Sequence, residues 1–564
     1  MRRNLSALAN QSFDLLVIGG GIHGACVAWE ATLRGLSVAL VEQADFASGT
    51  SANSLKVIHG GLRYLQTADF QRMRQSIKER QTLMRIAPHL VHPMPVLVPT
   101  YGHSIKGKEA MAVAMKLNDI ISGDRNLPLQ DPQKHIPSGE TLSKAECLNE
   151  LPDLPTQGLT GAARFHDAQV YNSEQLVLAF IHSAAERGAQ IANYTRVTGF
   201  CKANTRVIGA TAQDQLTGNR FTIQAKNIIN ASGPWIDQLI STATGRSEPP
   251  HRLAKAINLV TRRPLFGHGQ SHAIGITGRA PGSRLFFIAP WRGKSLVGTW
   301  YGPDNEAIRP PIATTAEITD FIKQINQSYP SFDLTLDDVE WVHTGLLPSD
   351  GVSSETGDMK LTSHFQFTDH QSDGLRGLLS VMGVKYTTAR DLARKAVDWV
   401  FRDRDQTPVP SLSHQEPLKG GHIDQFQSFL NTAVQTYGDR IPAQAMQRLV
   451  YNYGSAYPEI LKEVGQALDI GLGKVSNHDI LAAEVRYSLN HTMPQTLSDV
   501  IFRRTELGAA GHPGDEAIQS CARVMATELG WTQAKQQQEI EQVQAHFPSH
   551  RPPLPTSQLT KAAC

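Results

Sequence analysis

A glycine-rich turn near the N-terminus constrains the fold of this chain more than any other feature. An apolar run at residues 15–18 predicts a buried strand, and three glycines with GxGxxG spacing follow it: Gly19, Gly21 and Gly24. In a dinucleotide-binding fold the first glycine allows a tight turn, the second lets the backbone approach a pyrophosphate, and the third lets helix and strand pack closely. The spacing alone is weak evidence, so the flanking sequence decides its meaning.

The residues after the turn complete a nucleotide-binding unit. Residues 25–33 predict a helix whose N-terminal N–H groups would face a phosphate, and residues 37–41 predict a second strand. Glu42 ends that strand, 18 residues after Gly24, where a ribose-binding acid is expected. An acid at this position favours a free ribose hydroxyl, and therefore FAD or NAD rather than NADP.

The composition is typical of a globular protein with roughly two to four domains, given 564 residues and 40% hydrophobic content. Lys and Arg number 54 against 52 Asp and Glu, so the charge gives no reason to expect a nucleic-acid partner. The five cysteines show no CxxC or metal-ligand spacing, which favours reduced thiols, a cytoplasmic location and no metal site. No stretch reaches the ~18 apolar residues that span a bilayer, and no secretory segment is recognisable, so we expect any membrane contact to be peripheral.

A loop after the second predicted strand carries residues typical of a ligand site. Residues 45–66 are rich in Ser, Thr and Gly and end in the segment HGGLRY, from His59 to Tyr64. Loops that follow a nucleotide-binding strand lie at the carboxyl edge of the sheet, where ligands bind. Histidine is the residue type that most often acts as a general base, and the place of His59 in this loop makes it the candidate.

Two of these segments, IGGGIHGA at residues 18–25 and TSANSLKVIHGGLRYL at residues 50–65, together resemble the FAD-dependent glycerol-3-phosphate dehydrogenase family. LLSVMGVKYTTARDLA at residues 378–393 resembles the family's C-terminal flavin motif, and residues 484–508 resemble its helical domain. The resemblance spans about residues 13–545. It implies an α/β fold, namely a two-domain FAD-binding flavoprotein with a Rossmann-like FAD domain, a mixed-sheet substrate domain and an all-α C-terminal domain.

The resemblance to this family also predicts the order of the domains along the chain. The FAD-binding domain is expected in three parts, at residues 12–95, 156–245 and 341–405. A substrate or cap segment at residues 96–155 and a substrate domain at residues 246–340 would lie between them. A Pro- and Ser-rich linker at residues 406–417 would lead to the helical domain at residues 418–548.

Later segments are expected to complete the FAD site. The strand at residues 228–231 ends in Ser232 and Gly233, whose small size lets the backbone crowd the cofactor. The strand at residues 378–382 leads through a glycine into a helix, whose N-terminal N–H groups could stabilise reduced, anionic flavin. The resemblance also implies an adenine contact at Val197. The predicted cofactor-binding set is Gly19, Gly21, Gly24, Glu42, Thr50, Ser51, His59, Gly60, Val197, Ser232, Gly233, Gly383, Lys385, Tyr386 and Thr387.

The expected chemistry is hydride transfer from a secondary alcohol carbon to flavin N5 while a base removes the hydroxyl proton. His59 is the candidate base, Arg63 would orient the substrate or a flavin phosphate, and Lys385 would stabilise reduced flavin or an alkoxide. A cation such as Lys385 opposes the dipole at a helix N-terminus, which favours a functional role. The further substrate-binding candidates are Tyr64, Asn258, Arg292 and Trp300.

The substrate half departs from the family pattern at four places. Leu347 stands where the family's GVRP-type turn would supply an arginine, and Ser363 falls near a second family arginine. Asn258 stands where the family often has a histidine, and GTWY at residues 298–301 replaces GTTD. No neutral side chain replaces a bidentate, charge-assisted phosphate contact.

Several interpretations of this pocket stay open. In one, Arg292, Lys294 or Lys360 supplies the positive charge and the substrate is glycerol 3-phosphate, oxidised to dihydroxyacetone phosphate, or a related polyol phosphate. In another, the phosphate clamp is lost, Trp300 and Tyr301 line an altered pocket, and the substrate is a non-phosphorylated polyol or hydroxy acid. A flavin-binding protein without catalytic activity is a further alternative. The electron acceptor could be a quinone, oxygen or another molecule.

Expected partners and location follow mainly from the resemblance. Residues 106–121 could form an amphipathic helix, and the family associates a comparable region with membrane docking, although core packing explains its apolar face equally well. We expect a cytoplasmic protein, with peripheral contact to the cytoplasmic face of the membrane as an option. The helical domain could form the contact of a homodimer.

Overall fold

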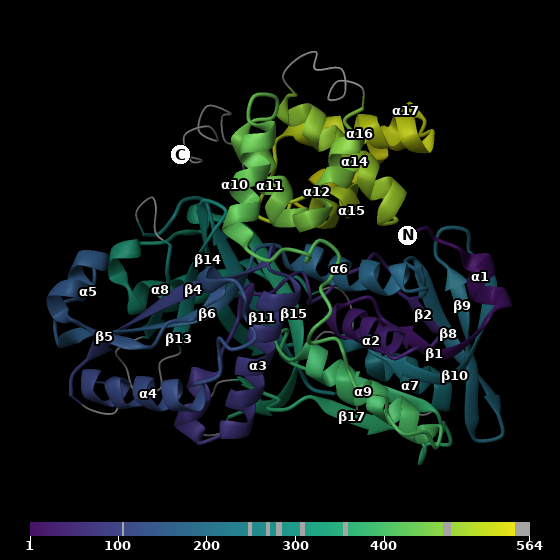
Figure 1. Ribbon diagram of the computed structural model, residues 1–564, viewed down its shortest axis with the longest axis horizontal. Coiled ribbons are helices and arrows are strands. Elements are labelled where there is room, and N and C mark those ends of the chain that lie inside the picture. The colour runs from purple at the N-terminus through teal and green to yellow at the C-terminus, as the bar shows by residue number, and fades with distance from the viewer. Residues whose placement is uncertain are drawn as a thin grey trace.

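Two β-sheets and a cluster of helices make up the described protein (Figure 1). The computed structural model describes residues 1–103, 107–245, 251–266, 271–277, 285–304, 311–353, 359–465 and 475–547. In Figure 1 the sheet that contains β1 (Ser12–Ile18) lies on the right, the sheet that contains β4 (Val91–Tyr101) lies on the left, and the C-terminal helices lie above both. The predicted domain limits at residues 246 and 548 and the predicted helix start at residue 106 lie outside the described residues.

The first sheet contains the parallel nucleotide-binding unit that the sequence predicts. Its strands run in the order β17-β18-β10-β1-β2-β7, and β8 and β9 extend it as a meander from β10. The bounds are β1, β2 (Val38–Val41), β7 (Gln190–Ala192), β8 (Thr195–Ala203), β9 (Arg206–Asp214), β10 (Arg220–Asn230), β17 (Gln366–Asp369) and β18 (Leu378–Met382). β10 pairs in parallel with both β1 and β18, so the loops that follow these three strands meet at one edge of the sheet.

Layers of apolar side chains cover both faces of this sheet. Leu15 and Val17 of β1 belong to a core with helices α2 (Ile22–Leu33), α6 (Ser173–Glu186) and α9 (Ala389–Asp403). Leu16 and Ile18 belong to a separate core with α1 (Leu5–Asn10) and α7 (Ile236–Thr244). Because successive side chains of a strand point to opposite faces, a strand covered on both faces must be apolar throughout.

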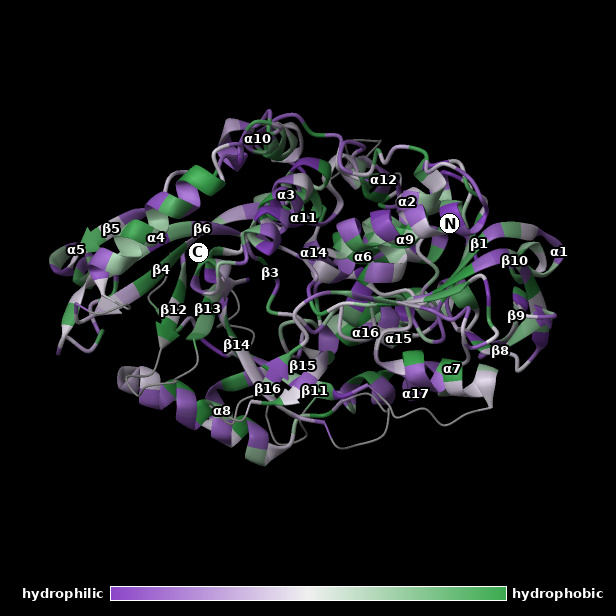
Figure 2. Cartoon of the chain, turned by 90° about the horizontal axis from the view of Figure 1, so that it is seen from below, coloured by the Kyte–Doolittle hydropathy of each residue, from purple (hydrophilic) through white to green (hydrophobic). Residues whose placement is uncertain are grey.

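The second sheet is mixed and runs in the order β16-β15-β11-β14-β13-β12-β4-β6-β3, with β5 beside β6. Its strands are β3 (Val57–Ile58), β4, β5 (Glu140–Ser143), β6 (Leu159–Val170), β11 (Leu253–Thr261), β12 (Ala273–Thr277), β13 (Leu285–Trp291), β14 (Lys294–Pro303), β15 (Val339–Val352) and β16 (Met359–Leu361). Its helices are α3 (Phe70–Ile86), α4 (Lys108–Ile121), α5 (Lys144–Glu150) and α8 (Thr315–Ser328). Apolar and polar residues alternate along α8 (Figure 2), because Phe321, Ile322 and Ile325 are buried against the sheet while its other side faces solvent.

The C-terminal domain is helical, as the sequence predicts. Its helices are α10 (Phe426–Tyr437), α11 (Ala443–Tyr453), α12 (Tyr457–Lys462), α14 (Asn477–His491), α15 (Leu497–Asp499), α16 (Asp515–Leu529) and α17 (Gln533–Gln544), with a π-helical turn at Val500–Arg504. Buried polar contacts attach this domain to the rest of the protein: Arg504 pairs with Asp45, and Tyr171 donates to Glu506. The domain is therefore fixed against both sheets rather than only tethered by its linker.

Three sequence expectations concern the chain as a whole. Cys26, Cys147, Cys201 and Cys521 are unpaired thiols. In the part of the chain that the structure describes, no helix combines the length and apolarity needed to cross a membrane. The same residues contain no group of His, Cys, Asp and Glu side chains arranged to hold a metal ion.

Candidate active site

A cavity of about 2460 Å³ is lined by residues of both sheets and of the helical domain. Its walls include the glycine turn after β1, the loop at residues 41–57, the segment around His59, and the corners that follow β10 and β18. These segments are far apart in sequence, and the parallel pairing of β1, β10 and β18 brings them together. The cavity thus contains each motif on which the predicted cofactor site depends.

The glycine turn after β1 lines the cavity and packs tightly against the corner that follows β10. Gly19 has a φ of +112°, and a Cβ atom there would lie 2.5 Å from the carbonyl oxygen of Ala231. α2 begins with Gly21 as its N-cap, and glycine has no side chain that could cap the helix. Ile22 donates its N–H to Ser51 Oγ at 2.9 Å, while Gly21 and the first turn of α2 line the cavity. The remaining free N–H groups of a helix N-terminus that faces a cavity favour a phosphate there.

Glu42 holds the position of a ribose-binding acid at the end of β2. Its Oε2 accepts a hydrogen bond from Gly20 N at 2.7 Å, and its Oε1 accepts one from Ala44 N at 2.9 Å. Burial raises the pKa of Glu42 above its ordinary value, although both N–H groups favour the charged form. The carboxylate is therefore held in one orientation at the edge of the cavity, on the side where Val197 also lies.

The second glycine corner lies directly against the first. A Cβ atom at Gly383 would lie 2.9 Å from Nε2 of His23, which belongs to the first turn of α2. Burial lowers the pKa of His23 to about 4, so its ring is neutral at physiological pH. α9 begins after Thr388, again without a side-chain cap. Residues 382–387 of this second corner line the cavity, so the backbone before α9 meets the first turn of α2 at one wall.

His59 faces the cavity and is oriented by a buried carboxylate. Its Nδ1 lies 2.9 Å from Oδ2 of Asp167, and its ring centroid lies 5.3 Å from that of Phe287. Oδ1 of Asp167 accepts the N–H of Gly60 at 2.6 Å, and Arg80 pairs with the same carboxylate. Burial would raise the pKa of Asp167, but the contacts with His59, Arg80 and Gly60 hold it below its ordinary value. With Nδ1–H donated to Asp167, Nε2 of His59 is left to accept a proton from the cavity.

A group of cations gathers around Tyr64 on another part of the cavity wall. Nζ of Lys385 lies 4.1 Å from the centroid of the Tyr64 ring, and the guanidinium of Arg72 lies 4.4 Å from it. Arg72 pairs with Asp69 at 3.3 Å, whereas Lys385 and Arg63 form no hydrogen bond or ion pair with any described residue. Burial, with help from Arg72 and Arg63, lowers the pKa of Lys385 to about 7. These cations outnumber the acid beside them, which suits an anionic ligand.

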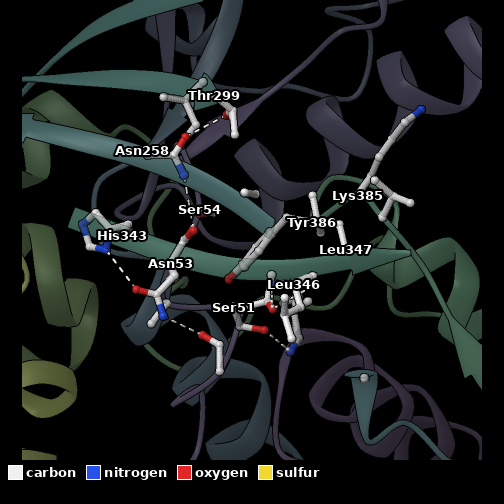
Figure 3. Close-up of a pocket in the computed structure, with 18 of the residues that line it drawn as sticks. Ser51, Asn53, Ser54, Asn258, Thr299, His343, Leu346, Leu347, Lys385 and Tyr386 are labelled. Carbon is white, nitrogen blue, oxygen red and sulfur yellow. Dashed lines mark hydrogen bonds between the residues drawn. The ribbon is translucent and has the colours of Figure 1, made fainter. Parts of the chain in front are cut away.

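The part of the wall formed by Leu347, Asn258 and His343 carries neutral side chains instead (Figure 3). Leu347 of β15 lines the cavity where the sequence comparison leads one to expect an arginine. Asn258 accepts a hydrogen bond from Thr299 Oγ1 at 2.7 Å and donates to the carbonyl of Asn53 at 3.4 Å. His343 lies with Nδ1 at 3.2 Å from Asn53 Oδ1, and burial holds its pKa well below its ordinary value. The polar groups on this wall bond mainly to one another.

Comparisons with known proteins give the family. Residues 14–384 match the model of the FAD dependent oxidoreductase family, and residues 411–536 match the model described as the C-terminal domain of alpha-glycerophosphate oxidase. The chain is 32% identical to a glycerol-3-phosphate dehydrogenase of Synechocystis over 556 residues, which cover 96% of this chain and 97% of the relative. This chain belongs to the FAD-dependent glycerol-3-phosphate dehydrogenase family.

Two other members of the family extend the comparison. The mouse mitochondrial glycerol-3-phosphate dehydrogenase is 31% identical over 94% of this chain and 72% of its own length. The crystal structure of the glycerol-3-phosphate dehydrogenase of Bacillus halodurans in complex with FAD matches with a TM-score of 0.73 and 26% identity, over 96% of this chain and 95% of that chain. The chain is thus an FAD-dependent oxidoreductase.

FAD fits the cavity of this family member. The N-terminus of α2 offers N–H groups to phosphate, the corner at residues 383–387 lines the cavity beside it, and Glu42 offers a carboxylate to a ribose hydroxyl. The predicted cofactor-binding residues that line the cavity are Gly19, Gly21, Glu42, Thr50, Ser51, His59, Val197, Ser232, Gly233, Gly383, Lys385, Tyr386 and Thr387. Gly24 and Gly60 do not line it. A Cβ at Gly24 would lie 1.9 Å from Gly19 O, and one at Gly60 would lie 2.2 Å from Arg80, so both glycines serve packing behind the wall.

The predicted substrate-binding residues divide into two groups. Arg63, Tyr64 and Asn258 line the cavity, as do Leu347 and Ser363, the positions of the missing family arginines. Trp300 and Arg292 do not, which corrects the sequence prediction. Trp300 donates its indole N–H to Asp320 of α8 at 2.9 Å. The guanidinium of Arg292 donates to the carbonyl of Glu506 in the helical domain at 3.1 Å.

Lys294 is excluded as a replacement cation for the same reason as Arg292. Its Nζ donates to the carbonyl of Ala510 at 2.8 Å, so it also serves the contact with the helical domain. Of the three cations considered from sequence, Lys360 alone lines the cavity. Leu347 and Ser363, which also line the cavity, are neutral. Lys360 would therefore have to bind a phosphate without help from a cation at either position.

Several cavity residues were not predicted from sequence. Asp167 and Arg72 lie on β6 and α3, in segments without a recognisable motif, and a carboxylate near the HGG segment could only be found from strand pairing. Tyr301 differs, because the altered-pocket interpretation already placed it in the cavity together with Trp300; it lines the cavity, while Trp300 points to the other face of β14. The helical domain contributes Thr496, Ser498, Asp499, Phe502 and Arg503, which a sequence of amphipathic helices does not reveal.

Proposed function

We propose that this family member oxidises the secondary hydroxyl of glycerol 3-phosphate to give dihydroxyacetone phosphate. The observation that supports this most is the pairing of His59 Nδ1 with Asp167, since His59 lines the cavity that the cofactor motifs surround. FAD, when bound, supplies the hydride acceptor. The names of the relatives, over nearly the full length of the chain, point to the same substrate.

The protein's own residues divide the remaining work. His59 Nε2 accepts the hydroxyl proton of the substrate, while Asp167 holds the ring in one tautomer and stabilises the imidazolium that forms. Arg63 and Lys385 attract the phosphate, and Arg72 adds positive charge beside them. Because Lys385 has a pKa of about 7, it is charged in only part of the free enzyme at neutral pH, and a bound dianion favours its charged form.

Reduction of the enzyme-bound flavin under anaerobic conditions tests this function. Glycerol 3-phosphate should bleach the flavin absorbance of the purified protein, and His59→Asn should bleach far more slowly at equal FAD content. His364→Asn, an exposed histidine outside the cavity, is the matched control and should behave as the wild type. A protein whose flavin stays oxidised with glycerol 3-phosphate would not have this function.

A second candidate is oxidation of a non-phosphorylated polyol or hydroxy acid. Its support is the neutral wall, where Leu347, Ser363 and Asn258 stand at positions that the family pattern gives to cationic side chains. The anaerobic assay separates the two candidates when glycerol and short 2-hydroxy acids are tested beside glycerol 3-phosphate. Bleaching by none of them would favour a flavin-binding protein without dehydrogenase activity.

We also propose peripheral contact with an anionic membrane surface through α4. Apolar side chains on and beside this helix are exposed: Phe70, Val113, Leu117, Ile120 and Leu127. Ile120 and Leu127 have 76% and 83% of their surface exposed, whereas Met115 is the one buried residue among those of α4. Core packing therefore accounts for only part of the apolar face. Lys78 and Lys116 are exposed as well and would face anionic headgroups.

Cosedimentation with vesicles of phosphatidylcholine and phosphatidylglycerol tests the membrane contact. The wild type should sediment with the vesicles, and the double variant Ile120→Ser, Leu127→Ser should stay in solution. Equal sedimentation of both proteins would contradict the proposal.

A membrane-bound enzyme suits a quinone as electron acceptor. Comparing the rate of reduction of a water-soluble quinone with the rate of oxygen uptake tests which acceptor the enzyme uses. The homodimer stays a prediction from the family resemblance, which sedimentation equilibrium tests.

A further inference from the structure

The helical C-terminal domain forms part of the wall of the cofactor cavity. Thr496, Ser498, Asp499 and Arg503 line it, and all four lie in or beside the short α15 and the π-helical turn that follows. This segment is far in sequence from the glycine turn after β1 and from both later glycine corners. A domain that only packed on the outside of the flavoprotein core would not line this cavity.

Arg503 reaches the cavity from within a buried ionic network. Its Nε donates to Oδ2 of Asp45 at 2.5 Å, and its Nη2 donates to Oδ1 of Asp499 at 2.6 Å. Arg504 occupies the remaining face of Asp45, with Nη1 and Nη2 at 2.7 and 2.6 Å from its two oxygens. Burial would raise the pKa of Asp45, but Arg504 and Arg503 hold it low, so the carboxylate is charged. Two nitrogens of Arg503 are thus committed to carboxylates, and Nη1 has no partner among the described residues.

The neighbours of Arg503 identify the part of the cavity that it faces. Asp45 follows Glu42 by three residues in the loop after β2, where the ribose-binding acid lies. Asp499 accepts a hydrogen bond from the hydroxyl of Tyr194 at 2.8 Å, and Tyr194 comes directly before β8, which carries Val197. Tyr194 and Val197 both line the cavity beside Glu42. This is the end of the site where the adenosine half of a dinucleotide binds in such a fold.

We propose that the helical domain completes the FAD site and that Arg503 is a direct ligand of the adenosine half of FAD. Its Nη1 donates to an oxygen of the ribose or of the adjacent phosphate, while Nε and Nη2 remain on Asp45 and Asp499. Arg504 has a different role: it is 1% exposed, does not line the cavity and fixes the domain to the loop after β2. Arg503 thus serves cofactor binding, and Arg504 serves domain attachment.

A consequence is that FAD binding and attachment of the helical domain stabilise each other. A ligand held by two domains stabilises the arrangement in which both touch it. In the apo-protein the linker at residues 406–417 should therefore be cut faster by a protease than in the holoenzyme. Adding FAD to the apo-protein should restore the protection.

Titration of the apo-protein with FAD, in competition with ADP, tests the role of Arg503. Arg503→Met should raise the dissociation constants of FAD and of ADP about tenfold, since a charge-assisted hydrogen bond to a ligand is lost. The matched control is Arg486→Met, in the same domain, whose side chain bonds to the carbonyl of Glu463 and lies outside the cavity. It should leave both constants unchanged.

The variant Arg503→Lys separates the loss of a cofactor contact from the loss of domain attachment. Lysine keeps a positive charge beside Asp45 but cannot also reach the cavity, so we expect the linker to stay protected while FAD and ADP bind more weakly. Unchanged affinity for FAD in both variants would overturn the proposal. A second result would also overturn the proposal: FAD binds more weakly only in variants whose linker is cleaved rapidly, and the affinity for ADP does not change. Arg503 would then act only in domain attachment.

Discussion

The cofactor side and the substrate side of the cavity are built from different kinds of information. On the cofactor side, glycine corners far apart in sequence meet as predicted, and the Cβ of a residue at position 383 would touch His23 of the first corner. On the substrate side, Trp300 and Arg292 lie away from the cavity, and the neutral residues Asn258 and Ser363 line it as Leu347 does. Backbone shape is encoded locally, whereas the direction of a pocket side chain depends on partners elsewhere in the fold.

The largest effect expected on the cofactor side comes from Gly19→Ala. The new Cβ would lie 2.5 Å from the carbonyl oxygen of Ala231, and the φ of +112° is unfavourable for alanine, so the turn must move and the purified protein should contain almost no FAD. Absorbance of the released flavin measures this. Gly35→Ala is the matched control, with a φ of +81° and no atom within 4 Å of the added carbon. It should lose about 1 kcal/mol of stability but keep its FAD.

The next largest effect should come from His59→Asn, at the boundary of the two sides. Loss of a general base lowers rates by about 10²–10⁴-fold, so stopped-flow reduction of the flavin should slow by that amount. The FAD content should not change, because the glycine corners and Glu42 remain. Reduction at the wild-type rate would remove His59 from the chemistry and leave the base unidentified.

On the substrate side, Leu347→Arg should restore a cationic wall. A new charge-assisted contact should lower the KM for glycerol 3-phosphate about tenfold and leave that for glycerol unchanged. Ser363→Arg, at the second missing arginine, should act in the same direction. If neither variant changes the KM for glycerol 3-phosphate, the neutral wall does not face the phosphate.

The smallest effect concerns the pH dependence of kcat/KM. Lys385 has a lowered pKa of about 7, so in the free enzyme it is charged below that pH and neutral above it. The kcat/KM for an anionic substrate should therefore fall as the pH rises through about 7. Arg72→Met removes a like charge, which raises the pKa of Lys385 and should move this fall to higher pH. A profile that does not move would mean that Lys385 does not bind the anion.

The sequence predicted the fold and most of the residues that line the candidate cofactor cavity, because each motif reflects a local requirement of the backbone. A glycine where no Cβ fits, an apolar strand and an acid at its end are readable without knowing the rest of the protein. The neighbouring residues Trp300 and Tyr301 show what is not readable: successive side chains of β14 point to opposite faces, and only the sheet decides that Tyr301 faces the cavity.

Contacts between domains are equally hidden from sequence. Arg292 follows the end of β13, has a φ of +52°, and is held by Glu506 of the helical domain. Asp167 reaches His59 through the pairing of β3 with β6, which joins segments more than a hundred residues apart. A positive charge or a carboxylate in the sequence does not reveal such a partner, so its role could not be assigned in advance.

Rapid anaerobic mixing with glycerol 3-phosphate, unlabelled and deuterated at C2, tests the central claim most directly. If His59 removes the hydroxyl proton while the C2 hydride passes to the bound FAD, the flavin should be bleached, and the deuterated substrate should bleach it several-fold more slowly. A flavin that stays oxidised with glycerol 3-phosphate but is bleached by a non-phosphorylated alcohol would contradict the account.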